Sequence, residues 1–110
     1  MIEPNSELII DYELVRNNIQ EIKKKLPKHC NFMGVIKSDA YGHDLKIATN
    51  AIKDVVDGFG AVRLDEALVI RENSSKPILA MQGVYSSDAY ELIKQKNIWT
   101  VVHSISQLPL

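Results

Sequence analysis

The stretch Gly34–His43 reads GVIKSDAYGH and joins an apolar run to a polar loop. The run Phe32–Ile36 is too short for a helix and apolar enough for a buried strand, so Lys37 directly follows a predicted strand. A lysine held against apolar walls is favoured in its neutral, nucleophilic form and can form a Schiff base with an aldehyde. A lysine in this position is more commonly a solvated charge at the rim of a sheet, so the pattern alone leaves both readings open.

Outward from this stretch, short apolar runs alternate with amphipathic segments. Pro27 ends the first amphipathic segment, and Ser104 is a predicted N-cap of a final helical turn. The helical spacing of apolar residues predicts helices over residues 12–25, 45–56, 64–71 and 87–95. Strands are expected over residues 6–11, 32–36, 59–62, 77–81 and 98–102, with Phe59 and Trp99 in the core.

The regular alternation of strand and helix, with almost no hairpin signal, predicts an α/β fold with a parallel sheet. The carboxyl ends of such strands share one side of the sheet, where α/β proteins place their chemistry. Four strands from Phe32 onward would be half of a (β/α)8 barrel, which takes roughly 250 residues when complete. A small open α/β sheet fits the same pattern.

Composition narrows the classes of function. The 110 residues carry 13 basic and 14 acidic side chains, without the clustered basic surface of a nucleic-acid-binding protein. We expect no metal site, because the three histidines lack metal-ligand spacing. No apolar run is long enough for a membrane span and no signal peptide is evident, so no membrane association is expected. With Cys30 the only cysteine, the expected location is the cytoplasm.

The segment Val35–His43 closely resembles the cofactor-attachment motif of alanine racemases, whose usual form is V-K-A-[DN]-A-Y-G-H-G. The resemblance continues in order along the chain, through Asn17–Ile19, Phe59–Leu68, Lys76–Leu79 and Thr100–Ser104. It implies the N-terminal part, about four βα units, of a barrel that binds pyridoxal 5'-phosphate (PLP). Residues 1–28 would form a lead-in strand and helix, and residues 29–110 the first half of the barrel.

By this resemblance, Lys37 would hold PLP and act as the base on one face of alanine. Tyr41 would contact the cofactor phosphate, and Val35 would line the pocket beneath the ring. The family implies a homodimer, an opposite-face tyrosine supplied by the partner, and D-alanine for peptidoglycan as the product. Two positions depart from the motif: Ser38 replaces Ala, and Asp44 replaces Gly and puts the fine geometry of the loop in question.

Several readings remain open at this point. The chain ends before the remaining family contacts, so we expect either a fragment or a degenerate relative that is inactive or nearly inactive alone and prone to self-association. The parent could also be another PLP-barrel amino-acid racemase or decarboxylase, or a non-catalytic α/β module. His43 is expected to fix the loop by hydrogen bonding, and His103 to be structural or to face solvent. Arg63 could reach an anion, although Asp65 and Glu66 offer local neutralisation.

Overall fold

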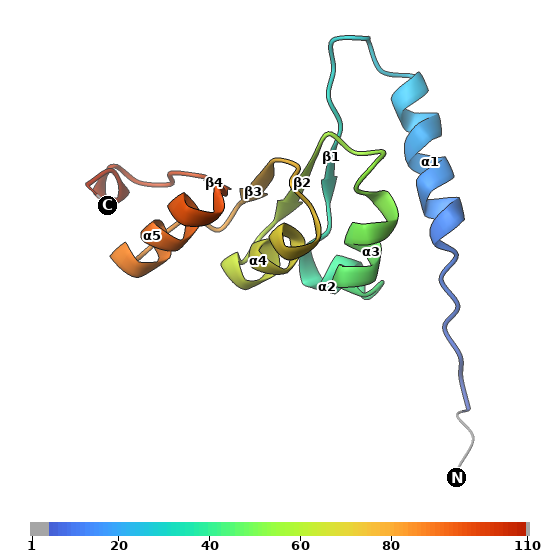
Figure 1. Cartoon of the computed structure of the whole chain (residues 1–110), viewed down its shortest axis with the longest axis horizontal. Coiled ribbons are helices and arrows are strands. Elements are labelled where there is room, and N and C mark those ends of the chain that lie inside the picture. Colours follow the sequence, from blue (N-terminus) through green and yellow to red (C-terminus); the bar gives the residue numbers. More distant parts are fainter. Residues whose placement is uncertain (1–4, 110) are drawn as a thin grey trace.

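The computed structural model describes residues 5–109, which form one parallel sheet with helices along one side (Figure 1). The strands are β1 (Met33–Val35), β2 (Gly58–Ala61), β3 (Ile78–Ala80) and β4 (Trp99–Thr100). The helices are α1 (Tyr12–Lys24), α2 (Lys37–Tyr41), α3 (Leu45–Ile52), α4 (Leu64–Asn73) and α5 (Ser87–Lys96), followed by a 3-10 turn, η1 (Ile105–Gln107).

The sheet is built from neighbours in sequence, in the order β1-β2-β3-β4, and every pair is parallel. A helix connects each strand to the next, as the right-handed crossover of parallel strands requires. The α/β class and the parallel topology expected from the sequence are therefore confirmed.

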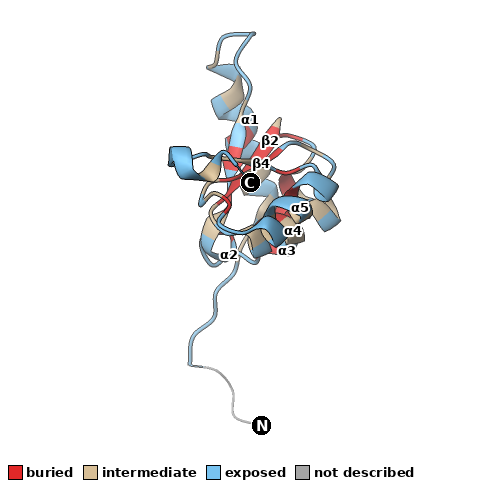
Figure 2. Ribbon diagram, turned by 90° about the vertical axis from the view of Figure 1, so that its left-hand side faces the viewer, coloured by how far each residue is buried: buried red, intermediate tan, exposed pale blue. Residues whose placement is uncertain are grey.

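Side chains of the strands alternate between two environments. Gly34, Phe59 and Ile78 are paired across β1, β2 and β3, and all three are buried on the side that the helices cover. Ile70 and Ala67 of α4 are fully buried there as well. In Figure 2 the buried residues lie on the strands and on the inner sides of the helices, whereas the segment before α1 is exposed. The core is thus a single layer between sheet and helices.

Two expectations were wrong. Residues 6–11 form no strand, because they find no neighbouring strand to pair with, and Leu8 and Ile9 remain more than three-quarters exposed. Trp99 lies in β4 as expected but is 53% exposed, whereas Phe59 is fully buried. Trp99 shares a row with Val35 and Gly60, on the side of the sheet that no described helix covers. A strand pattern predicts an apolar side chain here, but not whether its side of the sheet is covered.

Two groups of contacts join neighbouring units. Arg71 of α4 donates to the carbonyls of Ser74 and Lys76 before β3 and to those of Lys96 and Asn97 before β4. Burial lowers the pKa of the Arg71 guanidinium. At the other end, Arg16 of α1 pairs with Asp54 after α3. The loop from α1 to β1 contains the expected boundary at residues 28 and 29.

Candidate active site

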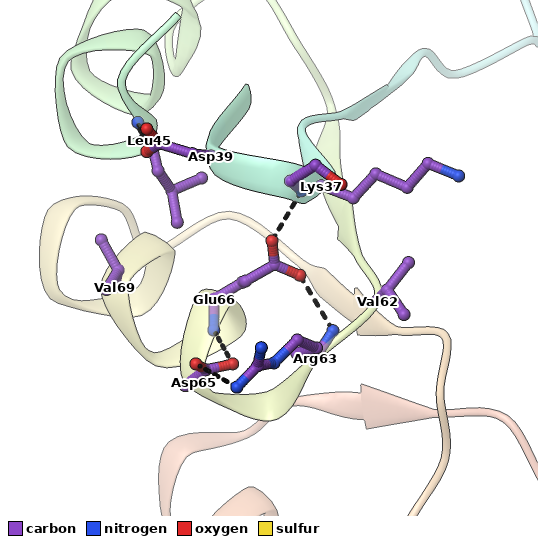
Figure 3. Close-up of a pocket in the computed structure, with 9 residues that line it drawn as sticks. Lys37, Asp39, Leu45, Val62, Arg63, Asp65, Glu66 and Val69 are labelled. Atoms are coloured by element: carbon purple, nitrogen blue, oxygen red, sulfur yellow. Dashed lines mark hydrogen bonds and ion pairs between the residues drawn. The ribbon is translucent and has the colours of Figure 1, made fainter. Parts of the chain in front are cut away.

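Lys37 lies at the carboxyl end of β1, two residues after Val35, which ends the strand. Its side chain is partly buried and extends away from Glu66 and Arg63, on the same side as Val62 (Figure 3). Within residues 5–109, no hydrogen bond or ion pair reaches the Lys37 ammonium group. The carboxyl end of a parallel strand is where α/β proteins place their chemistry, so Lys37 lies on the side of the sheet on which a ligand would bind.

The chain after Lys37 turns in the left-handed sense, and we call residues 38–41 the left-handed turn. Ser38, Asp39, Ala40 and Tyr41 have φ between 54° and 57°, and Gly42 follows with φ 89°. Left-handed backbone costs about 1–2 kcal/mol for each residue with a side chain and is normally seen at single positions. Four consecutive residues in this conformation therefore need support from their surroundings.

Glu66 of α4 supplies part of this support (Figure 3). One carboxylate oxygen of Glu66 accepts a hydrogen bond from the Ser38 backbone N–H at 2.7 Å, and the other accepts from the Arg63 N–H at 3.0 Å. The residue after the candidate lysine is thereby fixed to the start of α4. Asp39 fixes the other end of the turn, since its carboxylate accepts from the Leu45 N–H at 2.8 Å, at the start of α3.

Asp44, which departs from the family motif, adopts φ 71°, in the region that glycine enters freely. Its carboxylate accepts a hydrogen bond from the Ile47 N–H at 3.0 Å and so caps α3. Aspartate is among the residues that tolerate positive φ, and this cap offsets part of the cost. The backbone requirement of the motif is met at this position without glycine.

The far side of the left-handed turn contacts α1. The Tyr12 hydroxyl donates to the backbone carbonyl of His43, and His43 itself bonds through Nδ1 to the carbonyl of Ala40 at 2.9 Å. The loop-fixing role expected for His43 is thus confirmed. Tyr41 is 59% exposed and lines a small apolar pocket with Tyr12 and His43.

A larger open cleft, of about 610 Å³, lies between the left-handed turn and the start of α4. Lys37 borders this cleft. Most of the other polar side chains that line the cleft already bind one another or the backbone. Asp65 accepts from the Glu66 N–H and pairs with Arg63 at 3.0 Å, while Glu66 and Asp39 are engaged as described above. This network organises the backbone around Lys37. It also explains why Arg63, expected as a possible anion ligand, is neutralised locally.

The other side of the sheet offers an apolar surface beside Lys37. Val35 is 40% exposed there, opposite Gly60 of β2. A Cβ at Gly60 would lie 3.2 Å from Val35 Cγ2 and 3.4 Å from Met33 Sδ. A side chain at position 60 would therefore crowd Val35 and Met33, and glycine leaves the space beside Val35 open. Lys37 and Val35 therefore belong to one strand end. Tyr41 and Lys37 line different pockets, and the roles assigned to Val35, Lys37 and Tyr41 remain predictions.

His103 and the possible metal ligands add no further groups to this site. His103 is exposed and bonds through Nε2 to the Met81 carbonyl at 2.9 Å, consistent with a structural role. No group of histidine, cysteine or acidic side chains in residues 5–109 is arranged to hold a metal ion. None of the helices in this part of the chain is long and apolar enough to cross a bilayer.

Tyr12, Asp39 and Glu66 act at this site as hydrogen-bonding supports that the sequence analysis did not identify. Glu66 carried one signal, since a glutamate three residues after a predicted helix boundary is typical of a capping box. Tyr12 and Asp39 gave no comparable signal, because their partners are 31 and six residues away and depend on the left-handed turn.

Four consecutive parallel strands joined by helices, with Lys37 at the carboxyl end of the first, are the arrangement of the first half of a (β/α)8 barrel. The family model "Alanine racemase, N-terminal domain" matches residues 10–110. The chain therefore belongs to the alanine racemase N-terminal domain family.

Individual relatives agree with the family match. The chain is 42% identical over 95 residues to an alanine racemase of Mannheimia succiniciproducens and 41% identical over 95 residues to that of Pasteurella multocida; each match covers 86% of this chain and 26% of the relative. The chain thus spans about a quarter of the length of these curated relatives.

Solved structures give the same result for the fold. The biosynthetic alanine racemase of Pseudomonas aeruginosa superposes with a TM-score of 0.81 at 29% identity, over 89% of this chain and 27% of that one. An alanine racemase of Clostridium difficile in complex with cycloserine gives 0.76 at 30% identity, over 86% and 26% of the two chains. The expected N-terminal part of a barrel domain is confirmed.

Proposed function

We propose that this chain forms part of an alanine racemase that interconverts L-alanine and D-alanine with PLP, for peptidoglycan synthesis. The observation that carries the proposal is the placement of Lys37, with a free amine, at the carboxyl end of β1 within the family's motif. The proposal includes a homodimer for the full-length enzyme. A cytoplasmic location fits a chain whose only cysteine is the free thiol Cys30.

The residues present suit this cofactor. No described residue forms a hydrogen bond or ion pair with the Lys37 amine. Val35 supplies an apolar wall. Tyr41 has an exposed phenol that can donate to a phosphate oxygen. PLP, when bound, supplies an electron sink that stabilises the negative charge left at the α-carbon of the amino acid. Lys37 would hold the cofactor and exchange the α-proton on one face.

Racemisation also needs a base on the opposite face of the substrate. We assign that base to a part of the full enzyme other than these 110 residues, and we therefore expect this chain alone to be inactive. Serine racemisation or amino-acid decarboxylation by the full-length protein would favour the alternative PLP-barrel enzymes. Comparing its turnover of alanine and serine tests this choice.

The decisive test is cofactor attachment. PLP is added to the purified chain and reduced with borohydride, and the labelled lysine is mapped by peptide mass analysis. We expect label at Lys37 and its loss in Lys37→Arg, with Lys46→Arg, an exposed lysine of α3, as the matched control. Label spread over surface lysines would require the same experiment on a full-length racemase. Failure to label Lys37 there would disprove the cofactor assignment.

A further inference from the structure

The two peptide groups attached to the Lys37 Cα are held by different parts of the fold. In the group before Lys37, the Ile36 carbonyl accepts a hydrogen bond from the Ala40 N–H at 3.1 Å, within the same turn. In the group after Lys37, the Ser38 N–H donates to the Glu66 carboxylate at 2.7 Å, so this group is fixed to α4. The peptide group is planar, and Glu66 therefore fixes the orientation of one whole plane beside Lys37.

The orientation of these two planes sets the direction of the lysine side chain. The planes define φ and ψ of Lys37, and the Cα–Cβ bond leaves the backbone in a direction that depends on both. The Lys37 side chain extends away from Glu66 (Figure 3). Glu66 thus acts on Lys37 through the backbone and not through its amine.

The left-handed turn makes this hydrogen bond necessary. Ser38 has φ 54°, a conformation that is unfavourable for a residue with a side chain. Without an acceptor for its N–H, the Lys37–Ser38 peptide plane would rotate toward ordinary backbone values. Such a rotation changes ψ of Lys37 together with φ of Ser38, and the lysine side chain would start in another direction.

The Glu66 carboxylate is itself fixed by the start of α4. Its second oxygen accepts from the Arg63 N–H at 3.0 Å, in the capping box of that helix. A carboxylate held at both oxygens has little freedom, so it supplies a fixed reference point for the Lys37–Ser38 peptide plane.

We propose that Glu66 is a positioning residue for Lys37, which keeps the lysine aimed at the aldehyde of the cofactor. This role rests on the proposed function. Attachment joins the amine nitrogen to the aldehyde carbon, and the aldehyde oxygen leaves as water with the two amine protons. A correctly oriented amine reacts faster because a larger fraction of the molecules is ready for attack.

The test measures the rate of attachment in the full-length protein. Bound cofactor is removed with hydroxylamine, PLP is added back, and samples are reduced with borohydride at intervals for peptide mass analysis. Labelling of Lys37 should be about tenfold slower in Glu66→Ala, because fewer molecules hold the lysine in the competent direction. Glu66→Gln should recover part of the rate, since its amide oxygen still accepts one hydrogen bond. Glu72→Ala removes an exposed carboxylate near the other end of α4 and should label at the parent rate.

Two further measurements separate positioning from charge and from lost stability. Acetic anhydride is small and reaches an amine in any orientation, so the pH dependence of Lys37 acetylation without cofactor should be the same in Glu66→Ala and the parent. Ile93→Val trims a buried side chain of α5 and lowers stability away from the turn. PLP should label Lys37 in this variant at the parent rate.

The outcomes distinguish this role from the proposed function. A parent protein without label at Lys37 would overturn the proposed function and this role with it. Equally fast labelling of Lys37 in the parent and Glu66→Ala would overturn the positioning role alone. A shifted pH dependence of acetylation in Glu66→Ala would show that the carboxylate acts on the amine by its charge, and would refute positioning. Equal slowing in Ile93→Val would also refute it, because lost stability would then explain the effect.

Discussion

Two strand-to-helix connections of the same sheet differ sharply in backbone conformation. The first junction, residues 36–44, leaves β1 through the left-handed turn and reaches α3 only after Gly42 and Asp44, both at positive φ. The second junction, residues 62–63, leaves β2 in extended backbone, with Arg63 at φ −93° and ψ 150°, and enters α4 at once. One connection is strained over several residues, and the other follows ordinary geometry.

The difference shows that the unfavourable backbone conformation is confined to the junction that follows Lys37. The strained junction follows Lys37 directly, and elements distant in sequence hold it: Glu66 from α4 and Tyr12 from α1. Unfavourable backbone conformations persist where their surroundings over-determine them, and they concentrate at functional sites. The second junction relies mainly on its own cap, in which the Glu66 carboxylate accepts from the Arg63 N–H. Glu66 therefore serves both junctions, one as a local cap and one as a remote support.

The largest expected loss of stability comes from a core substitution that affects both junctions, Phe59→Ala. Phe59 is fully buried in β2 between the first and second junctions, so Phe59→Ala should lower the free energy of unfolding by about 3–5 kcal/mol. Urea denaturation measures the loss, and amide exchange should accelerate at Ser38 and Ala67 alike. A loss below about 1 kcal/mol would mean that the core collapses around the missing ring.

Removing the remote support should separate the two junctions. Glu66→Ala removes acceptors from two backbone N–H groups and should cost about 1–3 kcal/mol. Glu66→Gln should cost less because its amide oxygen retains one acceptor. Amide exchange at Ser38 should accelerate in Glu66→Ala but not in Asp65→Ala, whose carboxylate does not contact the turn. Equal acceleration in both variants would disprove the role of Glu66.

Glycine should have opposite effects at the two junctions. Ser38→Gly relieves a side-chain residue at φ 54° and should raise stability by about 1 kcal/mol. Val62 is not at positive φ and its side chain is half-buried, so Val62→Gly adds backbone freedom, removes apolar contacts and should lower stability by about 1 kcal/mol or more. Thermal unfolding midpoints of the two variants measure the contrast. Two changes of the same sign would mean that the left-handed turn stores no strain.

The smallest effect concerns the attachment of α1, which carries Tyr12. The hydrogen bond from Arg16 lowers the pKa of the Asp54 carboxyl below its ordinary value. The stability from this pair is present above the ordinary carboxyl pKa and is lost as the pH falls through the lowered value. The melting temperature should therefore fall slightly less with acidification in Asp54→Asn than in the parent. An identical pH profile in both would show that the pair contributes nothing measurable.

The fold was more predictable than the site. Apolar periodicity placed all four barrel strands and the helices α1, α3, α4 and α5, with boundary differences of up to four residues, because burial determines those positions; it did not predict α2. A local signal sufficed at Ser104, which caps η1 as expected, unlike at the left-handed turn. Ser38–Tyr41 carries no such signal, since its conformation depends on partners in α1 and α4. Two further differences also depend on neighbouring elements. Residues 6–11 form no strand because no strand lies beside them, and Trp99 is exposed because no described helix covers its side of the sheet.

The strand order has a consequence for biosynthesis. Each strand pairs with the preceding one, as in Met33 with Gly58, Phe59 with Ile78 and Leu79 with Trp99. Within residues 5–109, each of β2, β3 and β4 pairs with the strand immediately before it, so loop-closure costs for these three pairings remain small. A ribosome releases α1 and β1 first, and each later helix and strand finds a finished edge on which to dock. The sheet can thus grow in the direction of translation, one unit at a time.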